Sequence, residues 1–195
     1  MQRLALIRDC AAQAFVLRLG DPTPLGLAMT ALYVLASALL LTLALRRSGW
    51  GQGERLLWSA VGLGLVALTL NKQLDLQQSV IWTGRCVARA EGWFEQRLVF
   101  QRLFGSAMLL LMALGLGWLV WKCRLALAAN RVLLVGLVLL SLFVALQIAR
   151  FEQLAGGLGQ VIFQLRLHRI LEGVALLTLI WATLRRLMAR QNLVP

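Results

Sequence analysis

Long apolar runs separated by short polar segments dominate this chain. The runs predict helical spans at residues 25–45, 56–76, 103–121, 132–149 and 168–184. An α-helix needs about 20 predominantly apolar residues to cross a bilayer core of roughly 30 Å, and the core helices of soluble proteins need fewer. The pattern therefore predicts an all-α, polytopic membrane helix bundle that forms a single integral membrane domain over residues 1–195.

The second run ends in a polar stretch at an unusual position. Its apolar part, residues 56–70, is only about 22 Å long, so residues 71–78 must complete the span. A charged side chain at that depth costs roughly 2 to 3 kcal/mol unless it finds a partner, and such residues mark functional sites. The sequence therefore predicts a buried polar site, to which this run contributes Asn71, Lys72, Asp75 and Gln78.

The fifth run is also short and has polar residues at its beginning. His168 and Glu172 lie one helical turn apart there, Arg169 is three residues from Glu172, and Glu152 follows the fourth run. Both short spans become long enough only when these polar turns are included, so the turns should lie at the same depth. We therefore expect the second and fifth helices to be neighbours, with one shared polar cluster in the outer leaflet.

Simpler interpretations of these residues remain open. Lys72 can reach Asp75 within its own helix, and Arg169 can reach Glu172, so each pair could merely end a helix at the headgroups. The alternative is that His168 and Glu172 form a proton acceptor or half of a metal site. His168 is the single histidine and no C-x-x-C is present, so we expect no metal and no cofactor.

Two segments, residues 1–20 and 79–102, are amphipathic rather than apolar, and we expect both to lie along the membrane surface. In the second of these, Arg85 and Arg89 are one turn apart and tryptophans are interleaved with them. Arginine binds phosphate in bidentate fashion, which makes the two residues candidate contacts for a lipid phosphate. Ordinary interfacial anchoring is the alternative.

The net charge of +12 accompanies 60% hydrophobic residues and a mean hydropathy of +0.77. The basic residues stand at the ends of apolar runs and form no separate stripe, which argues against a nucleic-acid partner. Segments 46–55, 122–131 and 185–195 are short and densely basic. The positive-inside rule therefore predicts an amino terminus outside and a carboxyl terminus in the cytoplasm. The widely spaced Cys10, Cys86 and Cys123 are expected to be inert thiols.

Two stretches, NKQLDLQ at 71–77 and ARAEGWFE at 88–95, resemble a group of uncharacterised bacterial inner-membrane proteins. The resemblance covers about the middle half of the chain. It implies a location in the inner membrane of a bacterium and implies no function.

No nucleophile motif, phosphate loop or metalloprotease helix is present. We therefore expect a non-enzymatic accessory, lipid-handling or transport-related module whose partners are membrane lipids or other membrane subunits. The alternative is an intramembrane enzyme that acts on a lipid-linked substrate through Asp75, His168 and Glu172. Three ionisable groups converging on a pocket open to lipid would favour the enzyme, and a filled, fully paired cluster would favour the module.

Overall fold

Every element that the computed structural model describes is a helix. The described residues are 2–14, 23–46, 51–74, 76–149 and 158–188. The elements in chain order are α1 (Gln2–Ala14), α2 (Pro24–Arg46), α3 (Gln52–Leu74), α4 (Leu76–Ala90), the 3-10 helix η1 (Phe94–Gln96), α5 (Arg97–Lys122), α6 (Arg124–Ala129), α7 (Arg131–Ala149) and α8 (Leu158–Met188). The predicted all-α class is confirmed.

Five of these helices are long and apolar enough to cross a membrane, which confirms the predicted multi-pass bundle. The qualifying stretches are Pro24–Arg46, Gln52–Leu74, Arg102–Lys122, Arg131–Ile148 and Leu167–Met188. The second begins four residues before the predicted start, so α3 is 23 residues long, about 34 Å, and ends at Leu74. Residues 52–55 therefore provide part of the length that the span needs, and the polar turn is not required to complete it. Lys72 still lies inside the helix.

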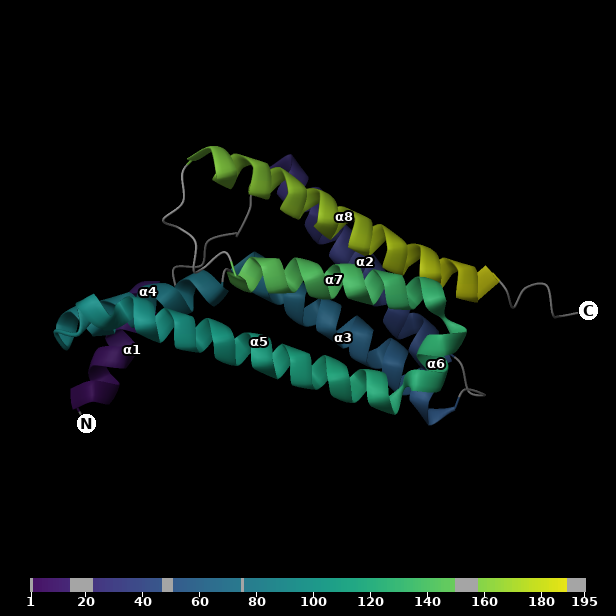
Figure 1. Ribbon diagram of the computed structural model, residues 1–195, viewed down its shortest axis with the longest axis horizontal. Helices are drawn as coiled ribbons and strands as arrows, with labels where there is room; N and C mark the ends of the chain where they lie inside the picture. Colours follow the sequence, from purple (N-terminus) through teal and green to yellow (C-terminus); the bar gives the residue numbers. More distant parts are fainter. Residues whose placement is uncertain (1, 15–22, 47–50, 75, 150–157, 189–195) are drawn as a thin grey trace, which may run out of the picture.

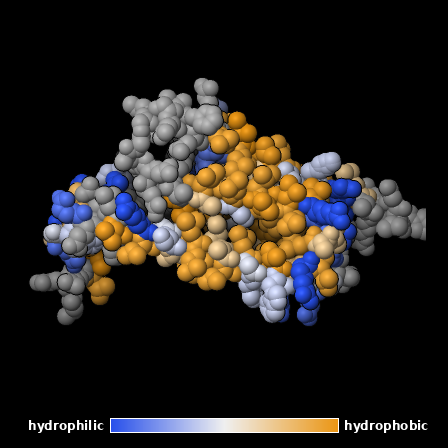
Figure 2. Space-filling model, in the orientation of Figure 1, coloured by the Kyte–Doolittle hydropathy of each residue, from blue (hydrophilic) through white to orange (hydrophobic). Residues whose placement is uncertain are grey.

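The helices pack in pairs around a common core. α2 packs along α3, α7 packs along α8, and α2 also contacts α8, so that α2 touches both of the helices expected to be neighbours (Figure 1). The largest fully buried side chains include Tyr33 and Leu40 of α2, Trp58 of α3 and Leu179 of α8. Apolar side chains cover the middle of the molecule, and hydrophilic ones gather toward its two ends (Figure 2). This distribution is typical of a protein that crosses a bilayer.

Two glycines allow the paired helices to approach each other closely. A Cβ atom at Gly62 of α3 would lie 2.8 Å from Cγ of Leu41 in α2. A Cβ atom at Gly136 of α7 would lie 2.7 Å from a methyl carbon of Leu179 in α8. Small residues at such contacts are what packing between membrane helices requires, because association there depends on close van der Waals contact.

The hydroxyl groups within the apolar helices bond mostly to their own backbone. Thr42, Thr69, Thr178 and Thr183 each donate to the carbonyl four residues earlier, at 2.5 to 2.8 Å. This arrangement satisfies polar groups where no water is available. A hydroxyl group that bonds to another helix therefore indicates a specific polar contact between the two helices.

The amphipathic segments form α1 and α4, which pack against each other at one end of the molecule (Figure 1). α4 ends in a Schellman motif, in which Gly92 adopts a φ of 78° and the Trp93 amide donates to the carbonyl of Ala88 at 3.1 Å. The expected single helix over 79–102 is therefore wrong. A turn and η1 follow α4, and residues 97–102 already belong to α5, because a glycine in the left-handed region ends the helix at residue 90.

Candidate functional site

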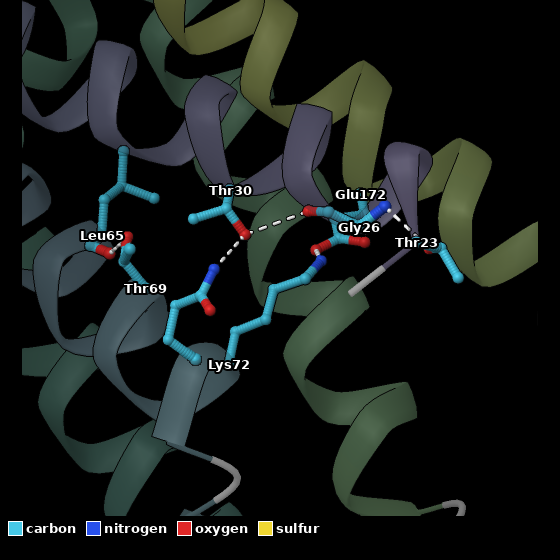
Figure 3. Close-up of polar contacts among 8 residues, drawn as sticks. Thr23, Gly26, Thr30, Leu65, Thr69, Lys72 and Glu172 are labelled. Atoms are coloured by element: carbon cyan, nitrogen blue, oxygen red, sulfur yellow. Dashed lines mark hydrogen bonds and ion pairs between the residues drawn. The ribbon is translucent and has the colours of Figure 1, made fainter. Parts of the chain in front are cut away.

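A buried ion pair joins the fourth turn of α8 to the last turn of α3. Lys72 Nζ donates to Glu172 Oε1, and the two residues are 100 positions apart in the sequence (Figure 3). The side chain of Glu172 is 4% exposed and that of Lys72 is 25% exposed. The pair is thus buried on its acidic side and partly accessible on its basic side.

α2 closes the site from a third direction. Tyr33 is 1% exposed and lies within hydrogen-bonding reach of the Glu172 carboxylate. The ammonium of Lys72 lies 5.5 Å from the centre of the Tyr33 ring, at cation–π distance. One tyrosine therefore contacts both members of the pair, and we refer to Tyr33, Lys72 and Glu172 as the ion-pair site.

A second polar link lies beside the ion-pair site. Gln73 Nε2 donates to Thr30 Oγ1 at 2.7 Å, and Thr30 in turn donates to the carbonyl of Gly26 at 3.0 Å (Figure 3). Thr30 is the hydroxyl group that connects two helices, α2 and α3. Thr23 accepts a hydrogen bond from the Gly26 amide at 3.1 Å and so caps α2, which begins at the following proline.

The charges in the ion-pair site neutralise each other. A lone carboxylate at the position of Glu172 would be strongly destabilising, because its desolvation would have no compensation. Lys72 supplies the opposite charge, and the Tyr33 hydroxyl supplies a further donor. Among the described residues the two charges of the site are paired, which is the arrangement expected of a cluster that holds helices together.

A matching ion pair lies at the opposite end of the same two helices. Arg186 near the end of α8 donates to Glu54 in the first turn of α3 at 2.9 Å. α3 and α8 are therefore bridged near both ends of their spans, whereas α2 contacts both of them along their lengths. The predicted contact between the second and fifth helices is present as these two side-chain bridges. The expectation that the helices are direct neighbours is wrong, because α2 packs against both and, in the described part of the chain, α3 and α8 do not pack along each other.

The structure brings together only part of the predicted cluster. Lys72 meets Glu172 as expected, but the predicted bridge between Arg169 and Glu172 is wrong, because Arg169 is exposed and Lys72 holds the carboxylate. The ring of His168 stacks on Phe143 of α7 with centroids 4.3 Å apart. Asn71 is half-buried. Asp75 and Glu152 lie outside the described residues, as does the side chain of Gln78.

Sequence analysis missed Tyr33 and Thr30. Both lie in the first predicted span, which looked uniformly apolar and unambiguous. A signal was available, since Tyr33 is the single tyrosine of the chain and Thr30 lies three residues before it, on the same helical face. Polar groups placed one turn apart inside an apolar span could have been added to the expected cluster.

The interpretation of the cysteines as inert thiols is wrong for two of them. Cys10 of α1 and Cys86 of α4 form a disulfide with a Cα–Cα distance of 5.8 Å. Their separation of 76 residues concealed the pairing in the sequence. Cys123, between α5 and α6, is a buried free thiol whose pKa is raised by that burial.

The candidate lipid-phosphate contacts lie on α4, next to this disulfide. Arg85 is half-buried, with its guanidinium 5.8 Å from the centre of the Trp82 ring, and Arg89 is exposed, 4.9 Å from the Phe94 ring. Both arginines thus lie at cation–π distance from an aromatic ring. Within the described part of the chain, no three histidine, cysteine, aspartate or glutamate side chains converge on a metal position.

Comparison with protein-family models, curated proteins and solved structures found no match. The resemblance to bacterial inner-membrane proteins therefore stays a prediction. Interpretation of the function depends on the geometry described above.

Proposed function

We propose that this protein is a non-enzymatic module of the bacterial inner membrane, an accessory or lipid-handling protein in which the ion-pair site locks three helices. The observation that supports this most is the pairing itself. The Glu172 side chain is 4% exposed and already has Lys72 and Tyr33 as partners, so its carboxylate is not free to exchange a proton with a substrate. A catalytic acid or base needs a substrate proton within reach of a group that is free to exchange it.

The second ion pair supports the same proposal over a transporter. A transporter that works by alternating access must open one end of its bundle while the other end closes. Here Lys72–Glu172 and Glu54–Arg186 bridge α3 and α8 near both ends. A bundle held in this way suits a rigid scaffold.

Two features support an orientation with α1 and α4 outside the cytoplasm. The Cys10–Cys86 disulfide requires an oxidising compartment, which in bacteria is the periplasm. The positive-inside rule places the densely basic segments 46–55, 122–131 and 185–195 in the cytoplasm, and the described residues of these segments lie at the other end of the bundle (Figure 1). Both features agree with an outside amino terminus and a cytoplasmic carboxyl terminus.

Lipid contact at the outer end follows from the same orientation. Arg85 and Arg89 lie at cation–π distance from aromatic rings on the helix that carries Cys86 of the disulfide, and tryptophan with arginine is typical of headgroup depth. The pair of helices α1 and α4 would then rest among the phosphates of the outer leaflet. The ion-pair site would lie beneath it, in the same leaflet.

Native mass spectrometry of the detergent-extracted protein tests the proposal, because it detects bound lipids and partner subunits together. We expect lipids or membrane subunits to be co-extracted. The double variant Lys72→Met with Glu172→Leu, which removes both charges, should retain the same bound set.

One result would contradict this function. The ion-pair site would be catalytic if the wild type converts a lipid-linked substrate that the double variant binds but does not convert. The double variant would have to show this loss while its melting temperature stays unaltered.

A further inference from the structure

A basic cavity lies at the end of the molecule opposite to α1 and α4. Its volume is about 350 Å³, and it is bounded by the end of α6, the beginning of α7 and the last turns of α8. Neither the ion-pair site nor the outer lipid contacts include any of its lining residues. This cavity carries the inference below, independently of the proposed function.

Three arginines line the cavity: Arg131 from α7, and Arg185 and Arg186 from α8. Arg186 is bound to Glu54, the one acidic residue in the segments 46–55, 122–131 and 185–195 at this end. Arg131 and Arg185 are exposed, and neither forms an ion pair with an acid of the described residues. The cavity therefore has two guanidinium groups available for an anion.

The backbone at the beginning of α7 adds donors to the same space. The amide of Leu134 is the first to bond back into this helix, to the carbonyl of Asn130 at 3.1 Å, so the amides of residues 131–133 precede the intrahelical ladder. The one side-chain hydrogen bond described for Asn130 runs the other way, from its Nδ2 to the carbonyl of Ala126 in α6 at 2.7 Å. The helix dipole further favours a negative charge at this position.

The limits of the membrane spans indicate headgroup depth for the cavity. Arg131 is the first residue of its membrane span, and Arg185 is three residues from the end of its own span at Met188. Directly inward, Val135 of α7 and Trp181 of α8 are 53% and 52% exposed. A molecule with a phosphate in the cavity could therefore lay its acyl chains along an apolar surface.

We propose that this cavity binds the phosphate of an anionic membrane phospholipid, with Arg131 and Arg185 as its principal contacts. Arginine matches phosphate oxygens in bidentate fashion, and basic pockets between membrane helices are known to hold acidic headgroups. Glu54 keeps Arg186 in place as part of the cavity wall. A zwitterionic lipid would bring its own cation into a space that already contains two.

The test is a lipid titration of the purified full chain in a zwitterionic detergent. The probes are phosphatidylglycerol, phosphatidylcholine with the same acyl chains, and inorganic phosphate, and binding is followed by native mass spectrometry and by the shift in melting temperature. The test variant is Arg131→Gln with Arg185→Gln. Its matched control is Arg46→Gln with Arg124→Gln, which removes two exposed arginines from the same end without touching the cavity.

The wild type and the control pair should bind phosphatidylglycerol in preference to phosphatidylcholine, and the test variant should bind it about tenfold more weakly. Equal binding of the two lipids by the wild type, or equal losses in the test and control variants, would overturn the proposal. If inorganic phosphate stabilises the protein as much as phosphatidylglycerol does, the proposal that the phosphate comes from a lipid is overturned.

A charge-conserving pair, Arg131→Lys with Arg185→Lys, decides the matter should the glutamine pair fail to fold. Lysine retains the charge and loses the bidentate geometry. We expect this lysine variant to bind phosphatidylglycerol more weakly than the wild type does. Unchanged binding would count against Arg131 and Arg185 as the principal contacts.

Discussion

Lys72 pairs with an acidic residue that is distant in the sequence. Asp75 is three residues away in the sequence, whereas Glu172 is 100 residues away and is the partner to which Lys72 donates. A lysine near the end of a membrane helix usually extends toward the headgroups. Here the lysine meets a buried carboxylate on α8, which needs a counter-charge to compensate its desolvation.

The first prediction concerns Glu172. Changing Glu172→Gln leaves Lys72 without its counter-charge and should lower the free energy of unfolding by about 1 to 3 kcal/mol, measured by thermal unfolding in detergent. The double variant Lys72→Met with Glu172→Leu should unfold near the wild-type temperature, because apolar replacements of a buried pair are often neutral.

Arg169→Gln is the control for this prediction. It removes an exposed charge from the same helix, one turn away, and should leave the melting temperature almost unchanged. A melting temperature for Glu172→Gln that equals that of this control would mean that the ion pair does not stabilise the bundle.

At the scale of single helices, packing depends on where a small residue faces a neighbour. Gly62 and Gly64 lie two residues apart on α3, so they point in different directions. A Cβ at Gly62 would meet Leu41 at 2.8 Å, whereas a Cβ at Gly64 would have nothing within 4 Å. The two positions form a matched pair for testing the α2–α3 contact.

The second prediction compares Gly62→Val with Gly64→Val. The first change should destabilise the protein by about 1 to 3 kcal/mol, because the added methyl groups must push α2 and α3 apart. The second should have a much smaller effect. Both changes alter helix propensity equally, but only the side chain at position 62 meets a neighbouring helix. Equal melting temperatures for the two variants would show that α2 does not pack on this face of α3.

The third prediction concerns the link between α1 and α4. In folded protein a maleimide should label no cysteine rapidly, because Cys10 and Cys86 are bonded and Cys123 is buried with a raised pKa that keeps its thiol neutral at pH 7. In denaturant without reductant, one thiol per chain should react. With reductant, all three cysteines of the sequence should react.

Mass spectrometry of the labelled chains gives the count directly. Three labels in denaturant without reductant would show that Cys10 and Cys86 are free. The variant Cys86→Ala serves as the control, because it should show two reactive thiols whether reductant is present or not.

For the whole molecule, the distribution of charge and the position of the disulfide together support the proposed orientation. The described residues of the basic segments, 46, 51–55, 122–131 and 185–188, lie at one end, and helices α1 and α4 with the Cys10–Cys86 disulfide lie at the other (Figure 1). Each feature by itself predicts the same orientation, with the basic end in the cytoplasm and the disulfide end outside it.

The fourth prediction is a topology experiment. A reporter that is active only in the cytoplasm should function when fused after Pro195 and fail when fused before Met1. Activity at the amino-terminal fusion with none at the carboxyl-terminal fusion would reverse the orientation. It would also place the disulfide on the cytoplasmic side, where it would be reduced.

The sequence by itself determined the helical class, the five spans and the two amphipathic helices. These features depend on local periodicity and on the length of apolar runs, because the thickness of the bilayer sets one length for every span. The errors in the limits of these helices were local: α3 begins four residues before its predicted start, and the second amphipathic helix ends at residue 90 instead of 102.

Only the tertiary structure decided which residues meet. The pairing of Lys72 with Glu172, the role of Tyr33, the Cys10–Cys86 disulfide and the basic cavity all depend on which faces of separate helices pack together. An apolar helix presents similar surfaces in every direction, so hydrophobicity alone does not select its neighbours in lipid. Close approach at residues such as Gly62 and the need to compensate buried charges make that selection, and both arise only when the helices are assembled.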